Sequence, residues 1–253
     1  MVYNKYTEKK SRLHKGLRVL SEEGFSSFMV KFAYYLERLN RRFFGSFIVA
    51  ALPQKSFAVN GKKYPYFIHR RNTTWVNERA VEIPFAMDLV KQHSPQTVLE
   101  IGAVLTNYFP YLPIQWDVVD KFEKSLGIIN ADVIDYKPLS KYDLIVTIST
   151  LEHVGQDDDI KDQNKIFQAL GNLQQNCLKK NGTLIVSIPL GYHHAFDNAL
   201  FENKLKFDEE YYLQRGRGLH WKQIPKEQAK GAKYGTYEYL SADVVFFGVM
   251  KNS

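Results

Sequence analysis

Hydrophobic residues recur at helical spacing in the first part of the chain and at strand-like spacing in the rest. Between residues 25 and 47, Phe, Met and Leu side chains fall on one face of a projected helix, and Lys and Arg fall on the opposite face. Ser21 and Pro53 are typical of a helix start and a helix stop. The pattern predicts a basic amphipathic helical appendage over residues 1–53, followed by a domain over residues 54–253.

The larger part predicts strands that alternate with helices. Asn60-Gly61, between two aromatic and β-branched runs, indicates a hairpin at residues 57–68. A helix is expected over residues 77–93, where Pro84 should kink it or mark a boundary. Another helix is expected over 162–178, and strands are expected over 97–101, 116–120, 131–134, 142–148, 183–188 and 243–250. This alternation predicts an α/β fold with a Rossmann-like, doubly wound, mostly parallel sheet and an antiparallel last strand.

Composition is that of a folded protein in a reducing compartment. Hydrophobic residues make up 45% and charged residues 24% of the chain, which excludes general disorder. Cys177 is the single cysteine, which excludes an internal disulfide framework and a four-cysteine zinc site. The longest nearly apolar stretch, residues 43–53, is too short to span a bilayer, and residues 1–10 lack a signal-peptide pattern. We therefore expect a cytoplasmic protein.

The formal charge of +7 is concentrated near the start, where residues 1–50 hold ten Lys or Arg against four Glu. Three interpretations of the amphipathic helix are open. It packs on the main domain or on a second copy in a homodimer, it contacts anionic lipid at the inner face of a membrane through residues 25–47, or it binds nucleic acid. The narrow basic face and the lack of a recognised reader motif argue against nucleic acid.

Candidate chemistry lies where the predicted parallel strands end, because ligands of doubly wound sheets bind outside the carboxyl ends of the strands. Glu100 and Gly102 end the first strand, Asp120 ends the second, Asp132 lies in the third and Ser149 follows the fourth. A carboxylate at the position of Asp120 can accept hydrogen bonds from both hydroxyls of a ribose.

These segments resemble the class I S-adenosylmethionine-dependent methyltransferases over roughly residues 77–190. The resemblance is carried by VLEIG at 98–102, VVD at 118–120, AD at 131–132, YDLIV at 142–146, LEHV at 151–154 and LKKNGTL at 178–184. TWVNERAVEIP at 74–84 and PLGY at 189–192 resemble a bacterial subgroup associated with polysaccharide and glycoconjugate biosynthesis. The resemblance implies S-adenosylmethionine as cofactor and O-methylation of a sugar or glycan intermediate.

The resemblance also implies a role for each matching residue. Glu100 and Gly102 flank the loop near the methionine part of the cofactor. Asp120 holds the ribose, Asp132 holds the adenine amino group, and Ser149 lies near the sulfonium.

The acceptor is expected beside Glu152 and His153. His153 is the candidate general base, because imidazole titrates near neutrality, and Glu152 is a second catalytic candidate. Further residues are expected at the acceptor pocket or its lid: Tyr192, His193, Arg215 and Trp221 at the pocket, and Trp75, Asn77 and Arg79 either as a lid or as a packing segment. Asp157–Asp159 is typical of a solvated loop, and adjacent histidines on extended chain point apart, so no metal is expected.

The loop after Gly102 departs from the glycine-rich pattern of the family. Ala103, Val104 and Leu105 follow it, and the side chains at 104 and 105 should crowd a ligand or force a different loop path. An alternative function is therefore a non-catalytic methyltransferase-fold scaffold that binds a partner or a membrane through residues 1–50. The two hypotheses differ in whether an open cleft joins Gly102 to Asp120.

Overall fold

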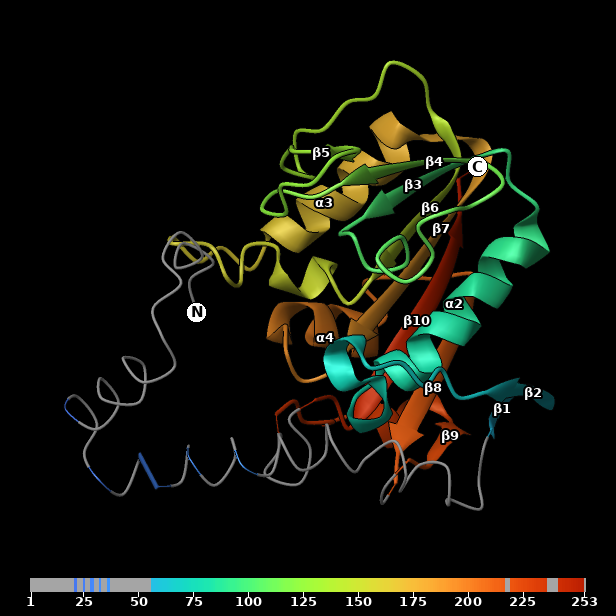
Figure 1. Ribbon diagram of the computed structural model, residues 1–253. Coiled ribbons are helices and arrows are strands. Elements are labelled where there is room, and N and C mark those ends of the chain that lie inside the picture. The colour runs from blue at the N-terminus through green and yellow to red at the C-terminus, as the bar shows by residue number, and fades with distance from the viewer. Residues whose placement is uncertain are drawn as a thin grey trace.

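The computed structural model describes residues 56–216, 219–235 and 241–252, and six positions between residues 21 and 36 (Figure 1). Those six positions are helical, and the apolar side chains of Phe25, Met29, Phe32 and Leu36 are exposed. The rest of the predicted appendage lies outside the described residues, so its extent and its partner stay predictions. No helix in the described ranges is both long and apolar enough to cross a membrane.

The described domain begins with the predicted hairpin. Strand β1 (Ser56–Val59) pairs antiparallel with β2 (Lys62–Pro65). Asn60 and Gly61 connect them with positive φ angles of 48° and 80°, as a tight hairpin turn requires. The prediction of a hairpin from Asn-Gly between two β-forming runs is therefore confirmed.

Helix α2 (Arg79–His93) continues through Pro84 instead of ending there. Proline cannot donate a backbone hydrogen bond, so the carbonyl of Ala80, four residues earlier, lacks its helical partner. The N–H of Phe67 donates to this carbonyl at 2.9 Å and takes the place of the missing bond. A short 3₁₀ helix, η2 (Arg71–Val76), leads from the segment of Phe67 into α2.

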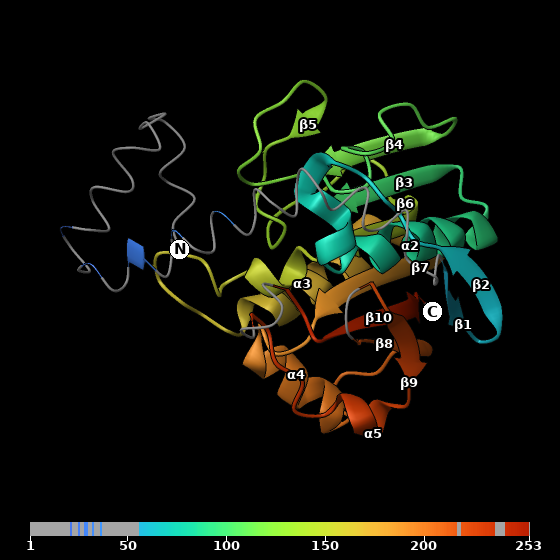
Figure 2. The same ribbon diagram turned by 60° about the horizontal axis from the view of Figure 1, so that its bottom comes forward.

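An eight-stranded sheet forms the centre of the domain, in the order β5-β4-β3-β6-β7-β10-β8-β9 (Figures 1 and 2). The five strands from β5 to β7 are parallel, and β10 pairs antiparallel with both β7 and β8, which confirms the predicted fold class. The strands are β3 (Thr97–Ile101), β4 (Gln115–Val119), β5 (Ile128–Ile129), β6 (Tyr142–Ile148), β7 (Leu178–Pro189), β8 (Glu209–Arg215), β9 (Trp221–Ile224) and β10 (Val244–Lys251).

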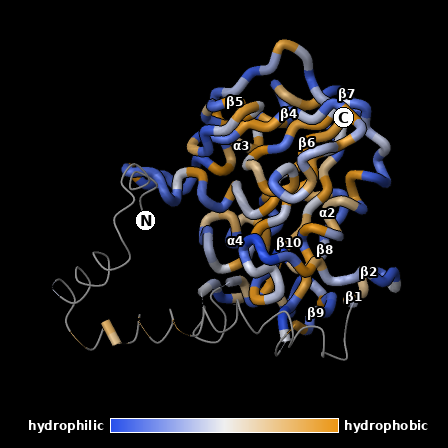
Figure 3. Tube along the Cα trace, viewed as in Figure 1, coloured by the Kyte–Doolittle hydropathy of each residue, from blue (hydrophilic) through white to orange (hydrophobic). Residues whose placement is uncertain are grey.

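Alternate residues of the central strands pack into two cores, one on each face of the sheet. Val98, Leu144 and Phe247 pack with the hairpin and α2, whereas their neighbours Leu99, Ile145 and Phe246 pack with the helices of the other face. Those helices are α3 (Lys165–Asn172), the π-helical turn η4 (Leu173–Cys177), α4 (His194–Phe201) and α5 (Lys226–Ala229). Hydrophobic residues accordingly follow the strands through the middle of the molecule (Figure 3).

Three expected elements differ from the structure. The third strand is Ile128–Ile129 and not 131–134, because the Asp132 carboxylate accepts the N–H of Ile134 and its carbonyl accepts those of Asp135 and Tyr136, which forms a turn. Helix α3 begins at Lys165 and not at residue 162. Strand β7 begins at Leu178 and not at residue 183, so Asn181, with a φ of 62°, lies within it.

Asp197 in the first turn of α4 gives the fold a pH dependence. One carboxylate oxygen accepts the N–H of Gly191 at 2.8 Å, and the other is buried with no partner in the described part of the chain. Burial raises the pKa of this carboxyl to about 6. The folded chain therefore binds this proton more tightly than the unfolded chain, and stability falls as the pH rises from about 4 to about 6.

We expect Asp197→Asn to stabilise the protein at pH 8 by up to about 3 kcal/mol, because the variant buries no charge there. The gain should disappear near pH 3, where the carboxyl of Asp197 is protonated in the folded chain and largely protonated in the unfolded chain. Urea unfolding at the two pH values measures the difference, with exposed Asp135→Asn as the control. Equal stabilisation at both pH values would exclude titration of Asp197 as its cause.

Candidate active site

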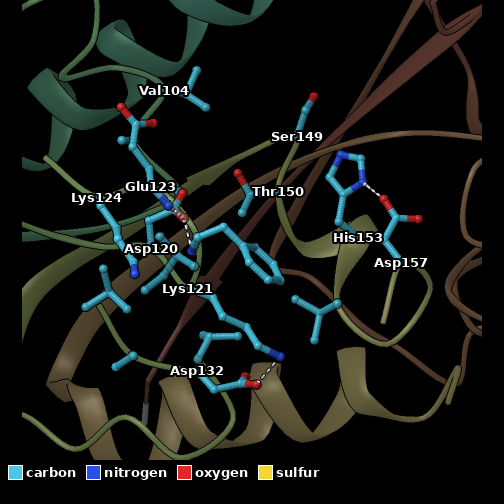
Figure 4. Close-up of a pocket in the computed structure, with 18 of the residues that line it drawn as sticks. Val104, Asp120, Lys121, Glu123, Lys124, Asp132, Ser149, Thr150, His153 and Asp157 are labelled. Atoms are coloured by element: carbon cyan, nitrogen blue, oxygen red, sulfur yellow. Dashed lines mark hydrogen bonds and ion pairs between the residues drawn. The ribbon is translucent and has the colours of Figure 1, made fainter. Parts of the chain in front are cut away.

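A cavity of about 850 Å³ lies at the carboxyl ends of β3, β4 and β6 (Figure 4). Its wall contains five of the residues that the sequence singled out: Gly102, Asp120, Asp132, Ser149 and His153. A volume of this size is typical of a pocket for a small molecule or cofactor. The structure therefore brings the residues predicted at the ends of successive strands together around one space.

Gly102 marks the bend where the chain leaves β3. Its φ is +79°, and a Cβ atom built on it would lie 2.2 Å from Oγ1 of Thr150, which follows β6. Its N–H donates to the carbonyl of Val119 at 2.8 Å. Both the backbone conformation and the close approach of Thr150 require glycine here, and the bend exposes backbone to the cavity.

Glu100 holds the loop after Gly102 from inside. Its buried carboxylate accepts the backbone N–H groups of Val104 at 2.8 Å, Leu105, and Thr106 at 3.2 Å, and the Nε1–H of Trp116 at 3.0 Å. Burial raises the pKa of this carboxyl, and these hydrogen bonds oppose the rise. Glu100 does not line the cavity, so the geometry gives it the role of shaping the loop.

The loop takes a path that leaves the cavity open. Leu105 is fully buried and packs into the core on the α2 side, away from the cavity. Its carbonyl accepts the N–H groups of Tyr108 and Phe109, so the chain turns as a helix directly after it. Val104 lies half-buried on the cavity wall. The side chains at 104 and 105 therefore do not close the cavity, whereas a closed cleft was the outcome that would favour the scaffold alternative.

Asp120 follows β4 and lines the cavity, and one of its two carboxylate oxygens is used in hydrogen bonds to the backbone. Its Oδ1 accepts the N–H groups of Phe122 and Glu123, both at 2.8 Å, which fixes the carboxylate on the turn. Its Oδ2 has no hydrogen-bond partner within residues 56–216, 219–235 and 241–252. This oxygen is available to a hydroxyl of a bound ligand.

Asp132 lines the cavity, but its carboxylate is already paired with the ammonium group of Lys121. Its Oδ2 lies 2.7 Å from Nζ of Lys121, and this Nζ lies 3.4 Å from Oδ1 of Asp158 (Figure 4). Oδ2 of Asp158 in turn contacts Nζ of Lys165 at 2.5 Å. The hydrogen bond to Asp132 is the largest cause of the raised pKa of Lys121. An adenine amino group would share Asp132 with Lys121, which the sequence did not indicate.

His153 belongs to a hydrogen-bonded group on the opposite side of the cavity. It ends the 3₁₀ helix η3 (Leu151–His153), and its Nδ1 lies 2.7 Å from Oδ2 of Asp157 and 3.1 Å from the hydroxyl of Tyr192. The Tyr192 hydroxyl donates to Asp157 at 2.9 Å. Burial of the phenol, and next its hydrogen bond to Asp157, raise the pKa of Tyr192. Because Asp157 occupies Nδ1, Nε2 is the nitrogen left for chemistry.

Asp157 and Asp158 thus differ from the interpretation of residues 157–159 as a solvated loop, which holds for the exposed Asp159. Both line the cavity, and their side chains are only 19% and 16% exposed because each one holds a basic partner. The run of three acids gave no sign of this, since the partners lie elsewhere in the sequence. Among the described residues, no group of three or more acidic, His or Cys side chains could hold a metal ion.

The other acceptor candidates do not line the cavity. Glu152 is buried behind His153, with its Oε1 3.8 Å from Nε2 of that residue. His193 is buried at the start of α4, where its Nδ1 accepts the N–H of Phe196, and burial lowers its pKa. Arg215 donates to the carbonyl of Val76 and to Ser241, and its guanidinium lies 5.8 Å from the ring of the buried Trp221. Of the three lid candidates, Arg79 lines the cavity.

No protein-family model and no curated protein matches the sequence. Among solved structures, the chain is similar to the N-methyltransferase NodS from Bradyrhizobium japonicum in complex with S-adenosyl-L-homocysteine, with 12% identity, a TM-score of 0.40, and coverage of 69% of this chain and 91% of that one. The chain is also similar to an S-adenosylmethionine-dependent methyltransferase from Clostridium acetobutylicum, with 11% identity, a TM-score of 0.39, and coverage of 68% of this chain and 91% of that one. A third similar structure is a sugar N-methyltransferase from a Streptoalloteichus species, with 11% identity, a TM-score of 0.35, and coverage of 68% of this chain and 87% of that one. These structural neighbours are S-adenosylmethionine-dependent methyltransferases.

Proposed function

We propose that the protein is an S-adenosylmethionine-dependent methyltransferase that methylates a hydroxyl of a sugar or glycan intermediate. The observation that carries the proposal is the single cavity shared by the Gly102 bend and the free oxygen of Asp120. This arrangement lies at the carboxyl ends of parallel strands, where nucleoside ligands bind in doubly wound sheets. The motifs VLEIG, VVD, AD and LEHV support it, because each of them contributes residues to the wall of the same cavity.

The residues on the cavity wall fit the cofactor. Oδ2 of Asp120 can accept a ribose hydroxyl, and Gly102, which lines the cavity without a side chain, allows a close approach of the methionine part. Asp132 and Lys121 stand at the adenine end. When bound, the cofactor supplies a methyl group on a positively charged sulfur, which is the electrophile of the reaction.

His153 is the residue placed to take the acceptor's proton. Asp157 at 2.7 Å accepts Nδ1–H and so keeps Nε2 unprotonated and able to act as a base. The acceptor oxygen would bond to the methyl carbon as the sulfur–methyl bond breaks to leave a neutral thioether, and the proton of that oxygen would move to Nε2 of His153. Asp157 then stabilises the imidazolium, and Glu152, with Oε1 at 3.8 Å from Nε2, lies on the same side.

Isothermal titration of the full chain with S-adenosylhomocysteine tests the cofactor site. We expect binding by the native protein and an affinity about 10- to 100-fold lower for Asp120→Ala, because a hydrogen bond to a charged group contributes about 1.5–3 kcal/mol. Asp135→Ala removes an exposed aspartate outside the cavity and should bind like the native protein. If the native protein binds no cofactor, or if Asp120→Ala binds unchanged, the proposal fails.

A further inference from the structure

Four apolar side chains near the start of the chain lie together on one face of a helix. Phe25, Met29, Phe32 and Leu36 are helical, and they are 69%, 46%, 42% and 49% exposed. Their spacing of four, three and four residues follows the helical period, so the four residues, here named the apolar stripe, share a face. Neither core of the described domain contains any of them. The described part of the domain therefore leaves this stripe uncovered.

The stripe differs from the other large apolar side chains on the surface. Tyr111, Leu126, Leu139 and Ile160 are also exposed, but each stands in a different loop or turn. Single exposed apolar residues are normal in folded proteins, whereas a contiguous set marks a surface that binds something. Within the helix the rings of Phe28 and Phe32 stack with centroids 5.9 Å apart, which adds a further aromatic ring beside the stripe.

Positive charge is concentrated in the same part of the sequence. Residues 1–20 hold six Lys or Arg against one Glu, and residues 1–50 hold ten against four. The other 203 residues hold 24 Lys or Arg against 23 Asp or Glu, so they are nearly neutral. On a projected helix, Lys31 and Arg38 fall opposite the stripe. The segment thus combines an apolar face with an excess of basic residues.

Only one of the partners considered for this segment uses both properties. A second copy of the chain would cover the stripe, but it would bring two strongly basic segments together, which repel each other. Nucleic acid would neutralise the basic residues and leave the stripe in water. An anionic lipid surface takes up Phe, Met and Leu side chains at the boundary between head groups and acyl chains, and its head groups attract Lys and Arg.

We propose that the helix containing the apolar stripe lies in the plane of an anionic lipid bilayer and docks the protein on its surface. The stripe enters the head-group boundary, and the basic residues of positions 1–50 hold the segment at the negative surface. The proposal goes beyond the proposed function and does not rest on it, because it concerns no residue of the cavity.

Co-sedimentation of the full chain with lipid vesicles tests the proposal. One set of vesicles is pure phosphatidylcholine, and the other contains about 30% phosphatidylserine, which gives it a negative surface. We expect binding to the anionic vesicles to be at least about tenfold tighter than to the neutral ones, because several basic residues contribute. Raising the salt from about 0.15 to about 1 M should weaken this preference, since the Debye length falls from about 8 to about 3 Å.

Two double variants separate the apolar and the electrostatic contributions. Phe25→Gln/Phe32→Gln should lower the affinity for anionic vesicles at least about tenfold, and glutamine forms helices at least as well as phenylalanine. Lys9→Gln/Lys10→Gln should lower it at least about fivefold. Leu126→Gln/Leu139→Gln is the matched control, because it removes two exposed apolar side chains outside the helix and should bind like the native protein. Thermal unfolding shows that the domain of each variant is folded.

The outcomes that contradict the proposal are distinct. Absence of binding to anionic vesicles, or equal binding to both kinds, would overturn it. Unchanged binding of Phe25→Gln/Phe32→Gln would exclude the stripe as the docking surface. Light scattering and titration with duplex RNA are run on the same samples. A dimer that the Phe changes dissociate, or RNA binding without vesicle binding, would assign the segment to one of the other partners and overturn the proposal. None of these results bears on cofactor binding, so the proposed function is tested separately.

Discussion

Replacing Gly102 with alanine is expected to lower the affinity for S-adenosylhomocysteine at least about a hundredfold, which corresponds to about 3 kcal/mol. The new methyl group would lie 2.2 Å from Oγ1 and 2.6 Å from Cγ2 of Thr150, and a φ of +79° strains any residue with a Cβ. Relief of both requires the bend to move, and the bend is the backbone that the cofactor would approach in the proposed function. Isothermal titration measures the loss, and circular dichroism shows whether the variant is folded.

Gly231→Ala is the matched control, because Gly231 has the same φ of +79° but no atom within 4 Å of an added Cβ. It should bind the cofactor normally. The double variant Gly102→Ala/Thr150→Ala removes the two nearest atoms of Thr150 and should regain part of the affinity. Native-like binding by Gly102→Ala would show that the Gly102 bend does not border the ligand.

Phe85→Ala is expected to destabilise the protein by about 3–5 kcal/mol, the typical cost of removing a buried aromatic side chain. Phe85 is 2% exposed, and its ring packs edge to face against Tyr64, Tyr211 and Phe247 at centroid distances of 5.5, 5.0 and 4.8 Å. These residues come from the hairpin, β8 and β10, so the loss loosens three elements at once.

Urea unfolding gives the difference in free energy. Leu139→Ala is the control, because Leu139 is fully exposed and its removal should change stability by less than about 0.5 kcal/mol. A loss below about 1 kcal/mol for Phe85→Ala would mean that the core on the α2 side collapses around the missing ring.

The central strands could be predicted from sequence because they are buried on both faces. Residues 97–101 and 142–148 are near-continuous apolar runs, and β3 and β6 have these same bounds. Burial on both faces gives a signal that needs no knowledge of the neighbouring strands. The meeting of Gly102, Asp120 and Ser149 then followed from topology, since parallel strands end at the same edge.

The edge of the sheet and the acceptor side could not be predicted in the same way. Strand β8 reads EEYYLQR, in which the buried Tyr212, Leu213 and Arg215 stand among acidic and polar residues, so the sequence shows no clear apolar pattern. Arg215 was interpreted as a pocket residue, but its position is explained by Val76 and Ser241, which are far from it in sequence.

The pairing of His153 with Asp157 was likewise hidden. They are four positions apart, but the 3₁₀ helix η3 ends at His153 and the chain continues to Asp157 as a turn, so no helical periodicity linked the two. The proximity of Glu152 to Glu78 and Glu82 was hidden as well, because it depends on the packing of α2 beside β6.

The outermost strands of the sheet have a consequence for solubility. On one side the last strand, β5, has two residues, and on the other β9 has four. Unpaired strand borders are the usual templates for the polymerisation of β-rich proteins, and borders this short offer few backbone groups to an incoming chain. The short outer strands therefore give a second copy of the protein few backbone hydrogen-bonding groups with which to extend the wide apolar sheet.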